Sequence, residues 1–149
     1  MIVDIKHYKE LSKDELYDIL KLRCQVFVVE QTCPYLDIDG KDLDAYHLSC
    51  YEKDDLIAYL RILKKGVSYE EISIGRVLVK HNYRNKNIGR VMMEKSIDFI
   101  ENTLNEDLVR ISAQAYLESF YKSLGFSPVS DPYLEDDILH LEMLLKMYN

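Results

Sequence analysis

The segment with the clearest chemical potential is residues 84–90, Arg-Asn-Lys-Asn-Ile-Gly-Arg, which joins an apolar stretch to a predicted helix. The first turn of a helix presents unpaired backbone N–H groups and the positive end of the helix dipole, so it favours a bound anion. Basic side chains at that position are unfavourable unless an anion lies beside them. We therefore predict that this segment holds a phosphate or pyrophosphate group.

A solvated basic turn that simply ends a strand is the alternative explanation. The overall charge argues against it, because the chain has 19 basic and 26 acidic residues, a net charge of −7. Four basic side chains between Lys80 and Arg90 are a local exception to that balance. Other phosphate loops fit less well, since the chain has neither Gly-x-x-x-x-Gly-Lys-Ser/Thr nor three spaced glycines.

Length and composition predict one globular domain over residues 1–149. The chain is 48% hydrophobic and 30% charged, an ordinary balance for a domain that buries a core. Its acidity argues against nucleic-acid or anionic-membrane partners. A cationic substrate such as an amine and surface acidity for solubility explain it equally well. No apolar run approaches the roughly 18 residues that span a bilayer, and residues 1–9 lack the pattern of a signal peptide. We therefore expect a cytoplasmic protein.

The cysteines give no sign of a metal site. Cys24, Cys33 and Cys50 are odd in number and lack metal-ligand spacing. In a reducing compartment they are most simply free, partly buried thiols. A nucleophilic Cys33 beside Pro34 is the alternative, and no metal is expected.

Hydrophobic periodicity predicts the order βα, three strands, helix, strand, helix, then a last strand or pair of strands. Ser12 and Glu15 form a capping box, so the first helix should begin there and run towards Glu30. Gly125 should end the last helix in a left-handed conformation. The expected strands are residues 2–8, 45–51, 56–63, 71–80, 108–113 and 139–145, the later helices 88–104 and 116–124, and the loops 33–44 and 127–137.

Arg23 and Glu30 lie on the apolar face of the first predicted helix, seven and fourteen residues after Leu16. Charges on such a face are unusual, because burying an unpaired charge is unfavourable. Three explanations remain open: an arginine that reaches out from the edge of the core, an ion pair between the two residues, or a helix end that lines a cleft.

Residues 77–90 resemble the acetyl-CoA motif of the GNAT superfamily of N-acetyltransferases, Arg/Gln-x-x-Gly-x-Gly/Ala after a hydrophobic strand. Arg84 and Gly89 match its ends, whereas Asn87 replaces its middle glycine. Asn tolerates a positive φ better than other non-glycine residues, so a tight turn can survive. The resemblance implies that the acetyl-CoA site includes Val77, Leu78, Val79, Arg84, Asn85, Lys86, Asn87, Ile88, Gly89 and Arg90.

A second segment of the same superfamily follows about 30 residues later. Residues 114–126 resemble Asn-x-x-Ala-x-x-Phe-Tyr-x-x-x-Gly-Phe, with Gln114 in place of the family's CoA-contacting Asn. Tyr121 matches the Tyr that can protonate the leaving CoA thiolate, so the resemblance implies that it is the catalytic acid. One more aromatic residue on an amphipathic helix is the alternative, because the chain has 12 tyrosines.

The ElaA-like branch of the superfamily is the more specific resemblance. It covers about residues 8–145 and does not supply a substrate. It implies a GNAT-like α/β (mixed α+β) fold, with a mixed, mostly antiparallel, splayed sheet flanked by helices. The segments that carry it are residues 22–31, 33–35, 37–40, 111–115, 132–133 and 140–143.

The resemblance also implies a mechanism. A small-molecule or peptide amine would attack acetyl-CoA directly while backbone N–H groups near Val77 polarise the thioester carbonyl. The general base could be Glu30, His47 or Glu135, although a packed, hydrogen-bonded histidine is the simpler explanation of His47. Further candidates for the acceptor pocket are Arg23, Arg61 and His140. The chain could act as a monomer or a homodimer.

Three other functions remain open. Residues 22–31 are also similar to a helix of acyl-homoserine-lactone synthases, which share the expected fold. A catalytically weak regulator would bind acyl-CoA without needing Tyr121 for any transfer. A purely structural module would not bind CoA at all.

Overall fold

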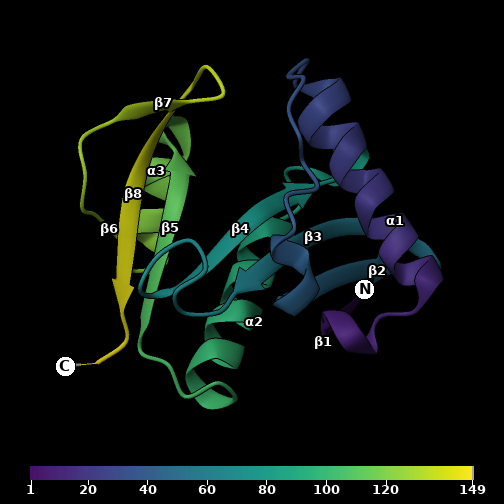
Figure 1. Cartoon of the computed structure of the whole chain (residues 1–149), viewed down its shortest axis with the longest axis horizontal. Helices are drawn as coiled ribbons and strands as arrows, with labels where there is room; N and C mark the ends of the chain where they lie inside the picture. Colours follow the sequence, from purple (N-terminus) through teal and green to yellow (C-terminus); the bar gives the residue numbers. More distant parts are fainter. Residues whose placement is uncertain (149) are drawn as a thin grey trace.

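Alternating apolar residues build one eight-stranded sheet in the computed structural model, which describes residues 1–148 (Figure 1). The strands run in the order β1-β2-β3-β4-β5-β8-β6, and β7 also pairs with β8. All pairings are antiparallel except β4 with β5, which confirms the predicted mixed, mostly antiparallel α/β fold. The strands are β1 Ile2–His7, β2 Tyr46–Glu52, β3 Asp55–Leu63, β4 Ile72–Val79, β5 Leu108–Gln114, β6 Ser127–Pro128, β7 Tyr133–Glu135 and β8 Ile138–Lys146.

The helices begin and end largely where the sequence predicts. The capping box is present, because Ser12 accepts from the Glu15 backbone and Glu15 accepts from the Ser12 backbone. The first helix reaches Glu30 as expected, but it changes from α to π winding at Cys24. The helices are α1 Lys13–Arg23, η2 Cys24–Glu30, α2 Ile88–Asn102 and α3 Glu118–Ser123, with short 3-10 turns η1 Tyr8–Glu10, η3 Lys41–Asp44, η4 His81–Tyr83 and η5 Ala115–Leu117.

Helices α1 and α2 cover opposite faces of the sheet. The apolar residues of α1 pack on Tyr59, whereas those of α2 pack in the cluster that contains Leu60. Successive side chains of a strand point to opposite faces, so the two helices lie on different sides of β3. The α2 cluster also contains Met143 of β8, and it therefore joins both halves of the sheet.

The sheet splays open between β4 and β5. Only two residue pairs join these parallel strands, Ile72 with Val109 and Ser73 with Arg110. Beyond them the strands run apart, as Figure 1 shows. This divergence confirms the predicted splayed sheet.

A β-bulge interrupts β4 just after the divergence. Gly75 is opposite Arg61 and Leu78 is opposite Tyr59, so Arg76 and Val77 together face the single residue between them. Arg76 has a φ of 52°, in the left-handed region that residues other than glycine rarely adopt. The extra residue locally disrupts the ladder with β3 and bends the strand.

Residues 127–137 differ from the predicted loop. Two short strands form within them, β6 and β7, and β7 joins β8 through a two-residue turn of Asp136 and Asp137. Both turn residues have positive φ, at 51° and 62°. Such a turn matches the twist of a hairpin, but the Asp-Asp pair lacks the glycine that usually marks it in a sequence.

Candidate active site

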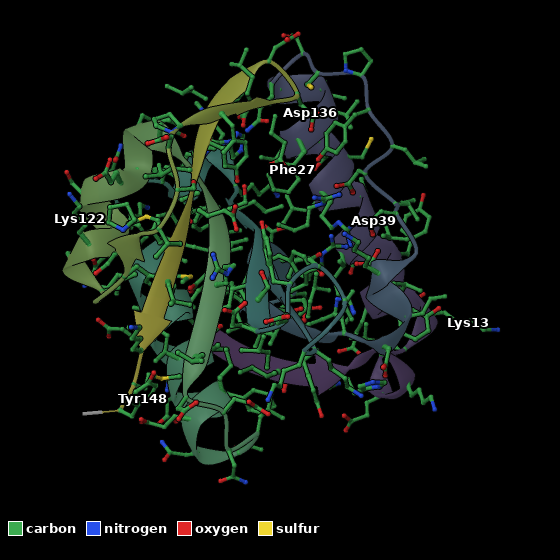
Figure 2. The ribbon with its side chains drawn as sticks, turned by 60° about the vertical axis from the view of Figure 1, so that its left-hand side comes forward. Lys13, Phe27, Asp39, Lys122, Asp136 and Tyr148 are labelled. Carbon is green, nitrogen blue, oxygen red and sulfur yellow. The ribbon has the colours of Figure 1, made fainter. Side chains whose placement is uncertain are left out.

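The divergence of β4 and β5 opens a cleft of about 690 Å³. One wall is the bulged part of β4, and the other is β5 with α3. The rim consists of η2, the loop at residues 33–41 and the β7–β8 hairpin. Figure 2 shows Asp136 at the hairpin tip, with Phe27 below it and Asp39 in the loop beside α1. The Cys33 thiol lies 3.9 Å from the Asp136 carbonyl oxygen, so loop and hairpin meet over the cleft.

The turn before α2 has the backbone that the sequence predicts. Asn85 and Asn87 both have a φ of 64°, and Asn87 is the N-cap residue of α2. The expectation that Asn87 can replace a glycine here is therefore confirmed. Gly89 itself needs no unusual backbone, and an added Cβ would meet only Phe120 at 3.8 Å. Because Gly89 has no side chain, the start of α2 stays open towards the cleft, which Gly89 lines.

The basic side chains of this turn have partners of their own. Arg84 donates to the Val79 carbonyl at 2.8 Å and to Glu30 at 2.5 Å, while Arg90 bonds Ser123. Lys86 lies over the Tyr83 ring at 5.5 Å. Of the residues predicted for this turn, Arg84 and Gly89 line the cleft; Asn85, Lys86, Asn87, Ile88 and Arg90 are not among its lining residues within 1–148.

Val77, Leu78 and Val79 line the β4 wall. The paired register with β5 ends at Ser73, so the edge of β4 beyond it has no strand partner among the described residues. A strand edge of this kind presents unpaired N–H and C=O groups to whatever occupies the cleft.

Tyr121 and Gln114 face β4 from the opposite wall. The Tyr121 ring packs edge-to-face against Phe120 and Phe126, with centroid distances of 5.1 and 5.9 Å. Burial raises the pKa of Tyr121 to about 12, so the phenol keeps its proton at neutral pH. Gln114 ends β5 opposite His140 of β8.

Of the three explanations for Arg23 and Glu30, the ion pair between them is wrong, whereas the helix end at Glu30 does line the cleft. Glu30 bonds Arg84 at the cleft, 54 residues away in the sequence. Arg23 is fully buried and bonds Asp37 at 3.0 Å and Asp42 at 2.7 Å. Both partners of Arg23 come from the predicted loop at residues 33–44, and no pattern in the sequence links that loop to Arg23.

Arg23 belongs to a group of three arginines and three aspartates, here called the Arg–Asp cluster: Arg23, Arg61, Arg76, Asp37, Asp39 and Asp42. Its formal charges cancel. Burial alone would raise the pKa of Asp42, but the hydrogen bonds and charges of Arg23 and Arg61 outweigh it and hold that pKa below its ordinary value. The cluster ties the rim loop to α1, β3 and the β4 bulge.

His47 is a packed histidine, as the simpler explanation predicts. It is 1% exposed, its Nε2 lies 3.0 Å from the Asp42 carbonyl, and its Nδ1 lies 2.6 Å from the Tyr59 hydroxyl. Burial lowers the pKa of His47. Neither Arg23 nor His47 is among the lining residues within 1–148, whereas Arg61 is. Arg61 contributes to the Arg–Asp cluster at the cleft floor.

His140 and Glu135 also line the cleft. His140 Nδ1 lies 2.7 Å from the Ile138 carbonyl, and its ring stacks on Tyr133. Several polar residues of the cleft were not predicted: Tyr35, Asp39, Tyr69, Arg76, Ser112 and Asp136. The alternation of Asp37 and Asp39 with apolar residues was the one available signal, because it places both aspartates on one side of the loop.

Comparison with known proteins assigns the family. A protein-family model described as an acetyltransferase (GNAT) domain matches residues 12–147. The chain belongs to the GNAT family. It is 45% identical to the protein ElaA of Escherichia coli K12 over 139 residues, which cover 92% of this chain and 91% of ElaA. The predicted GNAT, ElaA-like identity is therefore confirmed.

Solved structures of other proteins share this fold. An acyl-CoA N-acyltransferase from Pseudomonas aeruginosa superposes with a TM-score of 0.92 at 39% identity, over 97% of this chain and 99% of that one. The acyl-homoserine lactone synthase BjaI superposes with a TM-score of 0.82 at 16% identity, over 99% of this chain and 83% of BjaI. This is a likeness of fold alone. GNAT domains use acyl-CoA, and the chain is accordingly an acyltransferase.

Two further findings concern residues 1–148. None of their helices combines the length and apolar character that a membrane crossing requires. These residues also contain no group of three or more His, Cys, Asp or Glu arranged to hold a metal ion.

The Arg–Asp cluster makes Asp42 a sensitive position. Asp42→Asn removes the charge shared by Arg23 and Arg61. We expect the free energy of unfolding to fall by about 3 kcal/mol, near the lower end for breaking a buried ion pair because Asn keeps an accepting oxygen. Urea unfolding measures the change. Asp44→Asn, at an exposed carboxylate paired with Lys64 and His7, should leave the urea midpoint nearly unchanged. Equal midpoints for the two variants would contradict this role of the cluster.

Proposed function

We propose that the chain transfers an acetyl group from acetyl-CoA to a primary amine by direct attack in a ternary complex. The observation that carries this proposal is that the start of α2, the unpaired edge of β4 and Tyr121 border one cleft. An anion site, a row of backbone polar groups and a proton donor are therefore arranged along a single groove. This arrangement fits a long ligand with a phosphate end and a thioester end.

The phosphate end would lie at the turn before α2. Left-handed Asn85 and Asn87 shape this turn, and Arg84 with Lys86 supplies positive charge. The helix start adds N–H groups and the positive dipole end, both of which favour an anion. Because Arg84 already bonds Glu30, phosphate binding would rearrange or share this ion pair.

The thioester end would lie beside the bulge. N–H groups of Val77 to Val79 would stabilise the negative charge that develops on the carbonyl oxygen when the amine attacks. The new C–N bond forms, the C–S bond breaks, and the leaving thiolate takes the Tyr121 proton. Tyr121 carries this proton at neutral pH, because a phenol ordinarily has a pKa far above 7 and burial raises that of Tyr121 further. Holding the two substrates together supplies rate through proximity, and no covalent enzyme intermediate is needed.

The phosphate assignment predicts a loss of binding when its charge is reversed. Arg84→Glu with Lys86→Glu should abolish acetyl-CoA binding in calorimetry, since two cations become anions beside the phosphates. Arg84→Gln with Lys86→Gln should weaken it without placing a carboxylate opposite Glu30. Lys9→Glu with Lys13→Glu makes the same charge change at exposed residues and should bind normally. Unchanged affinity after the charge reversal at Arg84 and Lys86 would rule out this phosphate site.

The acid assignment predicts a defect in turnover. Tyr121→Phe should lower kcat by about 10²–10⁴, the usual range for general acid catalysis, with unchanged acetyl-CoA affinity. Tyr17→Phe, at an exposed residue of α1, is the matched control and should keep full activity. A Tyr121→Phe protein that binds acetyl-CoA and turns over at the wild-type rate would instead favour a different proton donor.

The acceptor is tested by release of free CoA from acetyl-CoA in the presence of defined amines. The panel contains spermidine, kanamycin, free amino acids, a tripeptide with a free N-terminus and a lysine-containing peptide. We expect one class to accelerate release well above the rate without amine. Tight acetyl-CoA binding without amine-dependent release across the panel would favour a regulator over an enzyme of this specificity.

A further inference from the structure

His140 stands opposite the β4 bulge across the cleft. Ser73 of β4 is paired with Arg110 of β5, and four residues further along each strand are Val77 and Gln114. Parallel strands rise equally, so Gln114 lies at the level of the bulge. His140 is the cross-strand partner of Gln114 and itself lines the cleft. Its imidazole therefore belongs to the part of the cleft where the thioester would react.

The hydrogen bonds of His140 define which nitrogen is basic. Nδ1 lies 2.7 Å from the Ile138 carbonyl, and a carbonyl oxygen can only accept. In the neutral ring Nδ1 therefore carries the hydrogen, and Nε2 has the free electron pair. Nε2 has no hydrogen bond within residues 1–148, and it is not among the fully buried side-chain atoms that lack one, so it is not fully buried.

Glu135 is placed to stabilise the protonated form of this imidazole. Its Oε2 lies 3.5 Å from His140 Nε2, too far for a good hydrogen bond but close enough for attraction to a positive ring. The Glu135 carboxylate is half exposed, so it connects His140 to solvent. The ring is further held by stacking on Tyr133, whose hydroxyl contacts Ser112 at 2.5 Å.

Two of the three predicted bases, His47 and Glu30, already have strong hydrogen-bond partners. Both nitrogens of His47 have hydrogen-bond partners, and His47 is not a lining residue within 1–148. Glu30 accepts from Arg84 at 2.5 Å, next to the phosphate turn. Glu135, the third predicted base, accepts from the Ser112 hydroxyl at 3.4 Å. His140 was predicted only for the acceptor pocket, but its Nε2 is free of a competing hydrogen bond within residues 1–148.

We propose that His140 is the general base, and that its Nε2 takes a proton from the attacking amine while Glu135 stabilises the resulting imidazolium. This proposal rests on the proposed acetyl transfer. As the C–N bond forms, the amine nitrogen loses a proton to Nε2, which passes it through Glu135 to solvent. The thiolate takes its proton from Tyr121, which regains one from solvent, so protons balance over the cycle.

Several other charged or titratable side chains surround His140. Glu135 and Tyr133 face it from β7, Asp136 follows in the turn, and Gln114 on β5 is neutral. Glu142 lies on the same face of β8 and pairs with Arg110. Burial raises the pKa of Tyr133, so this phenol stays protonated. Imidazole ordinarily changes charge between about pH 5 and 8, and it is the group expected to govern the acid side of the rate profile.

The test is the pH dependence of kcat/KM for acetyl-CoA with the best amine of the panel. In the wild type the rate should fall on the acid side as His140 is protonated. His140→Gln should lose that step and about 10²–10⁴-fold in rate at neutral pH, with unchanged acetyl-CoA affinity. Glu135→Gln should retain the step but move it to lower pH, because the imidazolium loses a negative neighbour. Any step from the amine itself will be shared by all variants.

The control is His7→Gln, which removes another carboxylate-paired histidine at the far edge of the sheet and should leave the profile unchanged. A His140→Gln profile that keeps every acid-side step of the wild type, or a Glu30→Gln profile that loses the step assigned to His140, overturns the assignment while acetyl transfer stands. An inactive wild type would overturn the proposed function itself. Nitrogen-15 shifts of the histidine rings give a test that does not depend on activity: a neutral His140 protonated on Nε2 would contradict the proposal even if the Gln variant failed to fold.

Discussion

The two-residue pairing between β4 and β5 is the constraint on which the molecule depends. A parallel ladder that continued past Ser73 and Arg110 would close the sheet and leave no cleft. The divergence gives up backbone hydrogen bonds, and the exposed groups must be satisfied by water or by a ligand. The core beneath holds the two halves at this angle, because residues of α2 pack with those of both β3 and β8. The core around α2 therefore fixes the opening between β4 and β5.

The two walls differ in how they are stabilised and in what they contribute. The β4 wall carries backbone groups, and the Arg–Asp cluster fixes its bulge through Arg76. The opposite wall carries side chains, with Tyr121 on a short helix and His140 beside a tight hairpin. A strained backbone segment needs rigid support, whereas proton-transfer groups need defined rotamers and access to water. Each wall has the kind of support that its role requires.

Much of this arrangement could be predicted from the sequence, because it depends on local patterns. Periodicity indicated the main strands and helices, the Ser12 and Glu15 spacing indicated the first helix start, and Asn87 could be interpreted from its tolerance of positive φ. The failures concern contacts between distant segments. Periodicity placed Arg23 and Glu30 on one helix face, but it cannot show which residues of other segments they contact. The bulge at Arg76 and the Asp-Asp turn also lack any composition that marks them.

The charge balance of the Arg–Asp cluster has a consequence for divergence among relatives. Its six residues come from α1, β3, β4 and one loop, and each arginine contacts two carboxylates. Losing a single member leaves a buried charge unmatched, whereas removing an arginine and an aspartate together restores neutrality. Substitutions in this cluster should therefore be inherited in compensating pairs. An alignment of homologues would then show covariation among these six positions and little among the exposed pairs on the surface.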